Sequence, residues 1–174
     1  MASTIPTVFR VFLIAALLAM GAIAGFFYAY EVSVTTGLAE VDDATYVTAM
    51  QAINSVIRNA PFAMSFFGAI VLTAVALVLA WRAAGWRSAT FWLIAAALAT
   101  YLLGGFGVTF ALNVPLNEEL AGVSLTAHQD LSGIRADYES QWNRWNTLRT
   151  VASLTAFALL AGSAVTRTGR PRRG

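Results

Sequence analysis

Of the 174 residues in this chain, 58% are hydrophobic and only 11% are charged, whereas a typical globular domain carries about 25% charged residues. This composition excludes an ordinary water-soluble domain and indicates an integral membrane protein. The net charge of +2 arises from eleven basic residues, all arginine, and nine acidic ones. The chain has no cysteine and one histidine, which excludes disulfides, thiolate metal sites and bis-histidine haem, so we expect no metal and no cofactor.

Four apolar stretches reach or nearly reach the ~20 residues that a membrane helix needs. They cover residues 11–30, 61–81, 89–112 and 147–165. Two long polar connections, at 31–60 and 113–146, and a short turn at 82–87 join them. We therefore predict a single membrane domain over residues 1–174. Its predicted fold class is all-α, an integral membrane four-helix bundle with an amphipathic helix and a helical extension on the extracytoplasmic side.

The charges divide between two sides of this bundle. Seven arginines and no acidic residue lie near the two termini and in the 82–87 turn, whereas all nine acids lie in the two long connections. By the positive-inside rule, both termini and the short turn face the cytoplasm and the long connections face outward. We predict a multi-pass plasma-membrane protein whose arginine-rich edge suits anionic lipid heads and gives no evidence of nucleic-acid binding. The oligomeric state stays open.

The first apolar stretch admits a second interpretation. Arg10, the apolar run and an Ala-Ile-Ala sequence before Gly25 resemble a secretory signal with its cleavage site. The apolar run continues to Tyr30, however, which is long enough for a full span. We therefore expect this stretch to form a membrane helix.

The first long connection predicts an amphipathic helix. It should begin at Asp42 or Asp43, either of which can cap a helix, and end near Asn59, because Pro61 restrains the preceding residue. An apolar stripe recurs with helical spacing, and a polar stripe lies on the neighbouring face and comprises Gln51, Asn54 and Arg58. We expect this helix to lie on the bundle or on the membrane interface.

The second long connection opens with a proline and closes with a helix. Pro115 should end or kink the third membrane helix. Gly133 should separate an irregular part from a helix that begins near Arg135 and continues into the fourth span. In the irregular part, we expect His128 to be an ordinary surface histidine, with a catalytic role as the alternative. We expect Glu118 and Glu119 to be solvated carboxylates rather than an acid/base pair or a cation site.

A polar and aromatic stripe runs into the fourth span. At about 100° per helical residue, Trp142, Trp145, Asn146 and Arg149 fall on one face. A charge at the centre of a membrane helix costs about 2.5–3.5 kcal/mol, and less near the interface, so Arg149 should turn into the bundle and find a partner. Glu31 ends the first span at the same depth, and we predict an ion pair between the two.

Alternating topology brings the outer ends of all four spans to one depth. Asn113 and Asn117 at the end of the third span, with Asn54 from the amphipathic helix, should meet Arg149 there. We predict a polar pocket beneath the outer connections. The alternative is an interfacial belt of aromatic rings with a snorkelling arginine and capping asparagines, which requires no pocket.

Four short motifs occur in order along the chain, namely YEVSV at 30–34, MQAIN at 50–54, NVPLN at 113–117 and WNRWNTLR at 142–149. Together they resemble the small four-span membrane proteins grouped with fungal anthrone oxygenases, whose bacterial members are long known as a domain of unknown function. The resemblance implies a four-helix membrane fold. For some members it also implies oxidation of anthrones to anthraquinones by molecular oxygen without an evident cofactor. It assigns no catalytic residue here, and function transfers less securely than fold.

The first functional hypothesis is an oxygenase for a lipophilic anthrone-like or phenolic aromatic that reaches the pocket from the lipid bilayer. Glu31, or His128 as the alternative base, would remove the activated ring proton. Arg149, with Asn113 or Asn146, would stabilise the oxyanion, although an ion pair with Arg149 would weaken Glu31 as a base. The expected substrate-binding residues are Trp142, Trp145, Asn146, Asn54, Asn117 and Tyr30.

The second hypothesis is a non-enzymatic tetraspan scaffold or partner-binding protein. A third, transport, is disfavoured because the helix interiors carry hardly any ionisable residues. A ligand-sized cavity bordered by Trp145, Arg149, Glu31 and Asn113 would favour the enzyme. A filled and fully hydrogen-bonded cluster would favour the scaffold.

Overall fold

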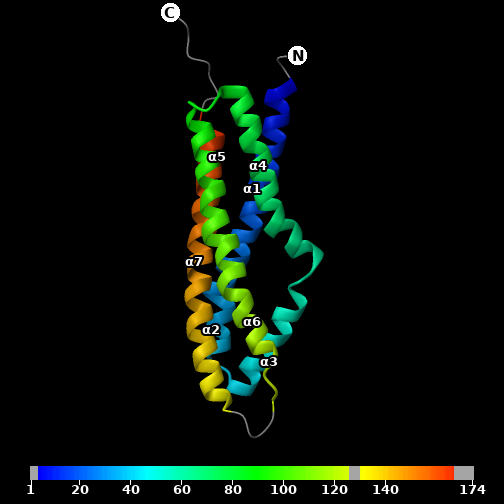
Figure 1. The fold of residues 1–174 in the computed structure, drawn as a ribbon, viewed down its shortest axis with the longest axis vertical. Helices are drawn as coiled ribbons and strands as arrows, with labels where there is room; N and C mark the ends of the chain where they lie inside the picture. Colours follow the sequence, from blue (N-terminus) through cyan, green and yellow to red (C-terminus); the bar gives the residue numbers. More distant parts are fainter. Residues whose placement is uncertain (1–3, 126–129, 167–174) are drawn as a thin grey trace, which may run out of the picture.

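A computed structural model describes residues 4–125 and 130–166, and all regular secondary structure in these two ranges is helical (Figure 1). Three long rods each consist of one helix or several continuous helical segments, and a fourth rod is shorter. In chain order the elements are α1 (Thr4–Ala29), η1 (Tyr30–Val34), α2 (Thr35–Ala39), α3 (Asp43–Val56), α4 (Ala60–Ala84), α5 (Ala89–Thr100), η2 (Tyr101–Gly107), η3 (Thr109–Asn113), α6 (Val114–Ala121) and α7 (Leu131–Val165), where η denotes a π-helix.

Four rods are long and apolar enough to cross a membrane, which confirms the predicted all-α four-helix membrane fold. They are Thr7–Ala39, Ala60–Ala84, Ala89–Ala121 and Leu131–Val165. The start of α1 and the end of α7 lie at the same end of the bundle as the α4–α5 turn (Figure 1). The assignment of that end to the cytoplasm remains a prediction.

Three of the rods are longer than the sequence predicted. The first continues past Tyr30 to Ala39, the third continues to Ala121, and the fourth begins at Leu131. At 1.5 Å per residue, rods of 33 to 35 residues are about 50 Å long, against a hydrocarbon core of about 30 Å. Much of the two long connections is therefore helix that projects beyond the membrane.

We expected Pro115 to end or kink the third helix, but the helix does not end there. The π-helical segment η3 closes at Asn113, and a new α-helix begins at Val114, so Pro115 occupies the first turn of α6. Proline is tolerated in a first turn because its missing N–H has no partner there in any case. The rod therefore continues through the proline.

The expected break at Gly133 is also wrong, because α7 begins before it. Asp130 caps the helix by accepting a hydrogen bond from the Gly133 amide at 3.0 Å. A Cβ at position 133 would lie 2.6 Å from Asp130 Oδ2. Gly133 thus packs closely against the cap and does not interrupt the helix.

The predicted amphipathic helix is α3, which ends at Val56, slightly earlier than expected. Its cap is Asp42, whose carboxylate accepts hydrogen bonds from the Thr45 amide at 3.0 Å and the Thr45 hydroxyl at 2.6 Å. These hydrogen bonds lower the pKa of the Asp42 carboxyl. The buried face of α3 carries Tyr46, Val47 and Met50, so the helix packs on the bundle.

Arg135 fastens the α2–α3 turn to α7. Its guanidinium donates to Glu139 at 2.8 Å and to Asp43 at 3.1 Å, and it lies 4.6 Å from the ring centre of Tyr46. It also donates to three backbone carbonyls of the turn, those of Leu38, Ala39 and Val41. Burial, with a smaller effect of Glu139, raises the pKa of Tyr46, and Arg135 opposes this rise. The outer helices are therefore held in a fixed position.

Two clusters of buried side chains divide the rods into a membrane half and an outer half. The membrane half is built on α1, α4, α5 and α7 and includes Phe27, Phe66 and Tyr101. The outer half joins η1, α3, α6 and α7 and includes Tyr30 and Trp142. Figure 1 shows the start of α4 and its connection to α3 standing away from the other rods at this junction.

Candidate functional site

The predicted stripe on α7 is present in part: Trp142, Asn146 and Arg149 face inward, whereas Trp145 is only partly buried. Trp142, Asn146, Arg149 and Ser153 are buried along this helix, with Tyr138 one turn before them. Their spacing of three and four residues keeps them on one face. The prediction that Arg149 turns into the bundle is confirmed, since only 6% of the residue is exposed.

Arg149 is held by two neutral hydrogen-bond acceptors and by two aromatic rings. Its Nη2 donates to Asn146 Oδ1 at 2.9 Å, and its Nη1 lies 3.5 Å from the Thr109 hydroxyl. The guanidinium carbon lies 4.5 Å from the ring centre of Phe27 and 5.2 Å from that of Trp142. Such cation–π contacts attract a desolvated cation, but they do not neutralise it.

The predicted ion pair between Arg149 and Glu31 is not among the ion pairs of the described residues. Asn146 stands between the two groups. Its Oδ1 accepts from Arg149, and its Nδ2 donates to Glu31 Oε2 at 2.9 Å. The other oxygen of Glu31 accepts from the Thr147 hydroxyl at 2.7 Å. The amide therefore connects the cation and the carboxylate while it keeps them apart.

Arg149 thus carries a buried charge without a direct anion. In residues 4–125 and 130–166, no carboxylate is hydrogen-bonded or ion-paired to it, and its Nε has no hydrogen-bond partner. A buried cation is costly unless it is paired. The arrangement therefore favours any anion that can approach the guanidinium.

A second group of polar side chains lies beside Arg149, and its members are hydrogen-bonded to one another. Asn117 Oδ1 accepts from the Tyr138 hydroxyl at 2.8 Å and from Trp142 Nε1 at 2.9 Å. Asn54 Nδ2 donates to the Tyr138 hydroxyl at 3.2 Å. These bonds join α3, α6 and α7, and they fix the plane of the Trp142 ring.

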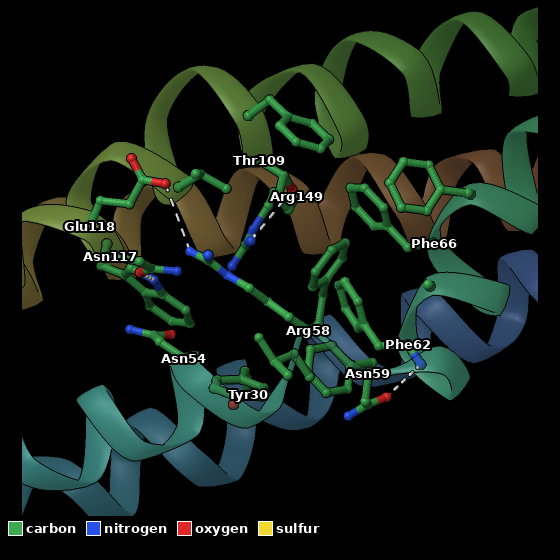
Figure 2. A pocket seen from close by; sticks show the side chains of 18 of the residues that line it. Tyr30, Asn54, Arg58, Asn59, Phe62, Phe66, Thr109, Asn117, Glu118 and Arg149 are labelled. Carbon is green, nitrogen blue, oxygen red and sulfur yellow. Dashed lines mark hydrogen bonds and ion pairs between the residues drawn. The ribbon is translucent and has the colours of Figure 1, made fainter. Parts of the chain in front are cut away.

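A cavity of about 600 Å³ adjoins both groups (Figure 2). This volume lies within the range of about 300–1,000 Å³ that is usual for small-molecule sites. Most of its wall is apolar, and its aromatic lining comprises Phe26, Phe27, Tyr30, Phe62, Phe66, Phe67, Phe110 and Trp142. The polar lining comprises Asn54, Arg58, Asn59, Thr109, Asn117, Glu118 and Arg149.

One ion pair lies across the rim of this cavity. Arg58, in the α3–α4 connection, extends toward Glu118 on α6 (Figure 2), and the two charged groups are 3.8 Å apart. Their side chains are 68% and 64% exposed. An exposed pair at this distance contributes little stability, so a ligand can separate it at low cost.

Three π-helical segments lie at the level of the site. Segment η1 carries Tyr30, and η3 carries Thr109 and Asn113. The third, η2, directly precedes η3 in the same rod. A π-turn widens a helix by one residue and is frequent at functional sites. Here these segments carry Tyr30 and Thr109, which both line the cavity.

The structure divides the predicted site residues into two groups. Those that line the cavity are Arg149, Trp142, Tyr30, Asn54 and Asn117. Those that do not line it are Glu31, Asn113, Asn146 and Trp145. Asn113 and Asn146 are fully buried behind the wall, and the Trp145 ring packs on the Arg144 guanidinium at 5.1 Å. His128 lies outside the described residues.

Two charged lining residues, Arg58 and Glu118, were not predicted as site residues. A signal for Arg58 was present in the sequence, because Gln51, Asn54 and Arg58 recur with helical spacing. The structure places Arg58 just after α3, and Gln51 on α3 donates to the Leu120 and Val123 carbonyls at 2.9 Å. Glu118 gave no signal beyond its position after Asn117. Within the described ranges, no group of three His, Cys, Asp or Glu residues could hold a metal ion.

The comparison with protein families gives one match. The model of the anthrone oxygenase family matches residues 61–159, more than half of the chain. This range includes the NVPLN and WNRWNTLR motifs, and with them Asn117, Trp142 and Arg149. No curated protein and no solved structure matches the chain. The chain belongs to the anthrone oxygenase family.

Proposed function

We propose that this protein is a membrane oxidoreductase that uses molecular oxygen to oxidise a lipophilic, readily ionised aromatic compound, such as an anthrone or a phenol. The observation that carries the proposal is the buried guanidinium of Arg149. It lacks a direct anion among the described residues and lines a cavity with eight aromatic side chains. Membership of the anthrone oxygenase family supports the same substrate class.

The reaction converts an activated methylene group into a ketone. Removal of one methylene proton leaves a carbanion whose charge is shared with the ring oxygen as an enolate. This anion reduces oxygen and forms a carbon-bound hydroperoxide. Loss of water then breaks the O–O bond and the remaining C–H bond, so that one oxygen atom stays in the ketone and the other leaves as water.

Arg149 fits the step in which charge develops on the ring oxygen. Fixed donors in a site that excludes water stabilise such an anion far better than water-exposed donors do. Asn146 holds the guanidinium from behind, and Trp142 and Phe27 flank it. The wall offers ring faces on which a flat tricyclic substrate can stack.

A scaffold role is supported by the side chains of Asn54, Asn117, Tyr138 and Trp142, which are hydrogen-bonded to one another. This group joins three helices and requires no ligand. It does not account for a cavity of about 600 Å³ beside an unpaired buried cation. We therefore assign it the role of holding the outer helices around the cavity.

The test is oxygen uptake by membranes that contain the protein, with an anthrone as substrate. The wild type should accelerate uptake over control membranes and release the quinone. Arg149→Met should reduce the rate by about 10²–10³-fold, as does the loss of other anion-stabilising donors. Arg144→Met is the matched control, because Arg144 lies on the same helix, is exposed and does not line the cavity.

The folded state of each variant is checked by its elution from a size-exclusion column in detergent. Arg149→Lys, which keeps a positive charge, should retain more activity than Arg149→Met. The proposal fails if the wild type accelerates oxygen uptake with none of a panel of anthrones, hydroquinones and phenols.

A further inference from the structure

The cavity contains a carboxylate that the sequence did not single out as a base. Glu31, the predicted base, does not line the cavity, and its two oxygens accept hydrogen bonds from Thr147 and Asn146. Glu118 is the one carboxylic acid among the described residues that line it. A base must come within hydrogen-bond reach of the proton that it removes, so position favours Glu118.

We propose that Glu118 is the general base that takes the methylene proton of the aromatic substrate. This inference rests on the proposed function and names a catalytic residue for it. The carboxylate accepts no hydrogen bond from any side chain or amide in the described parts of the chain, and its contact with Arg58 is 3.8 Å long. Its lone pairs are therefore available to a substrate.

The position of Glu118 is fixed by the residue before it. Asn117 accepts hydrogen bonds from Tyr138 and Trp142 on α7, which anchor this turn of α6 against the neighbouring helix. Both Asn117 and Glu118 line the cavity (Figure 2). The next residue, Glu119, does not line it. Two adjacent carboxylates of the same length therefore differ in access to the substrate.

The base and the cation suit the two ends of one substrate. In an anthrone, the ring oxygen and the methylene carbon lie on opposite sides of the central ring. Arg149 is 6% exposed and lies in the wall, whereas Glu118, with a side chain that is 64% exposed, lies at the rim. A ring that points its oxygen inward to Arg149 presents its methylene group toward the rim.

The proton passes from the methylene carbon of the substrate to the carboxylate of Glu118. The C–H bond breaks, its electron pair passes into the ring and onto the oxygen that faces Arg149, and a carboxylate oxygen of Glu118 forms an O–H bond. Glu118 returns the proton to the peroxide oxygen formed after reaction with oxygen, or to water at the rim.

The experiment separates proton removal from oxidation. Membranes with the protein are incubated with an anthrone in deuterated water without oxygen, and uptake of deuterium at the methylene carbon is followed by mass spectrometry. The wild type should accelerate this exchange over control membranes. Glu118→Gln should reduce the acceleration by about 10²-fold or more, and Glu118→Asp should restore part of it. Glu119→Gln is the matched control and should exchange at the wild-type rate.

The results distinguish the role of Glu118 as the base from the proposed oxidation. Equal exchange by the wild type and Glu118→Gln, or no acceleration by the wild type, overturns the assignment of the base. If wild-type oxygen uptake is normal and Glu118→Gln does not change it, the base is wrong and the proposed function stands. If the wild type exchanges protons and never consumes oxygen, the base stands and the proposed oxidation fails. Elution of folded Glu118→Gln from a size-exclusion column excludes misfolding as the cause of a loss.

Discussion

Asn146 links two opposite charges that do not touch. Because its Nδ2 donates to both Glu31 and the Phe27 carbonyl, its Oδ1 is directed to Arg149. The side chain is fully buried. Its loss would leave a buried cation with less support and a carboxylate with one hydrogen bond fewer.

We expect Asn146→Leu to lower the free energy of unfolding by about 1–3 kcal/mol, because buried polar partners lose their hydrogen bonds. The measurement is thermal unfolding in detergent, followed by circular dichroism. Asn143→Leu is the control, since Asn143 lies one turn earlier on α7 and its Oδ1 has no hydrogen-bond partner in the described structure. Equal destabilisation by the two substitutions would count against the role of Asn146.

Helical spacing and the cost of a charge in lipid predicted the inward stripe on α7 and the inward side chain of Arg149. The same reasoning chose the wrong partner for Arg149, because depth in the membrane does not show that Asn146, one turn away, would stand between Arg149 and Glu31. Glu118 could not be predicted either. Nothing in the sequence distinguishes it from Glu119, and only the anchoring of Asn117 separates their surroundings.

At the level of the helical elements, the segment η2 packs closely against α7. A Cβ at Gly104 would overlap the Cβ of Ala152. A Cβ at Gly105 would lie 2.6 Å from the Tyr101 ring and 3.2 Å from Ser153 Oγ. The small residues let the third and fourth rods approach each other closely.

Gly104→Ala should therefore destabilise the bundle by about 1–3 kcal/mol through overpacking. Ala152→Gly should recover part of this loss in the double variant, because it removes the opposing methyl group. Gly162→Ala is the control, since a Cβ at that position would meet nothing within 4 Å. Thermal unfolding of the four variants gives the coupling energy, and a value near zero would contradict the predicted contact.

The number, type and order of the long helices were predictable, because apolar length alone decides which segments cross a membrane. The π-helical segments were not predictable. They show no periodic signal, and they arise where tertiary packing shifts the hydrogen-bond register of a rod. The continuation through Pro115 has the same origin, since η3 ends where the proline can begin a new α-helix.

Across the whole molecule, the cavity has a polar rim and a second side that carries two partly exposed aromatic rings. The rim carries Arg58 and Glu118. On the other side, Phe67 of α4 and Phe110 of η3 line the cavity and are 46% and 48% exposed, with ring centres 6.5 Å apart. Both belong to rods that are long and apolar enough to cross a membrane. We infer that a lipophilic substrate dissolved in the bilayer would enter the cavity past these two rings.

We expect Phe110→Trp to narrow this passage and to lower kcat/KM severalfold for a membrane-dissolved substrate, with little effect on kcat at saturation. Leu103→Trp is the control, because Leu103 is 76% exposed on the same rod and does not line the cavity. Initial rates of oxygen uptake at increasing substrate in the membrane give both constants. A wild-type kcat/KM for Phe110→Trp would place the route at the rim.

The shortness of α4 has a further consequence. It has 25 residues, whereas the other three rods have 33 to 35, and residues 57–60, 62 and 63 border the cavity beside its start. An insertion or deletion in this stretch would change the depth of the cavity without displacing Arg149, which belongs to α7. Such a change would therefore alter the size of the molecule that fits the cavity and leave the guanidinium in place.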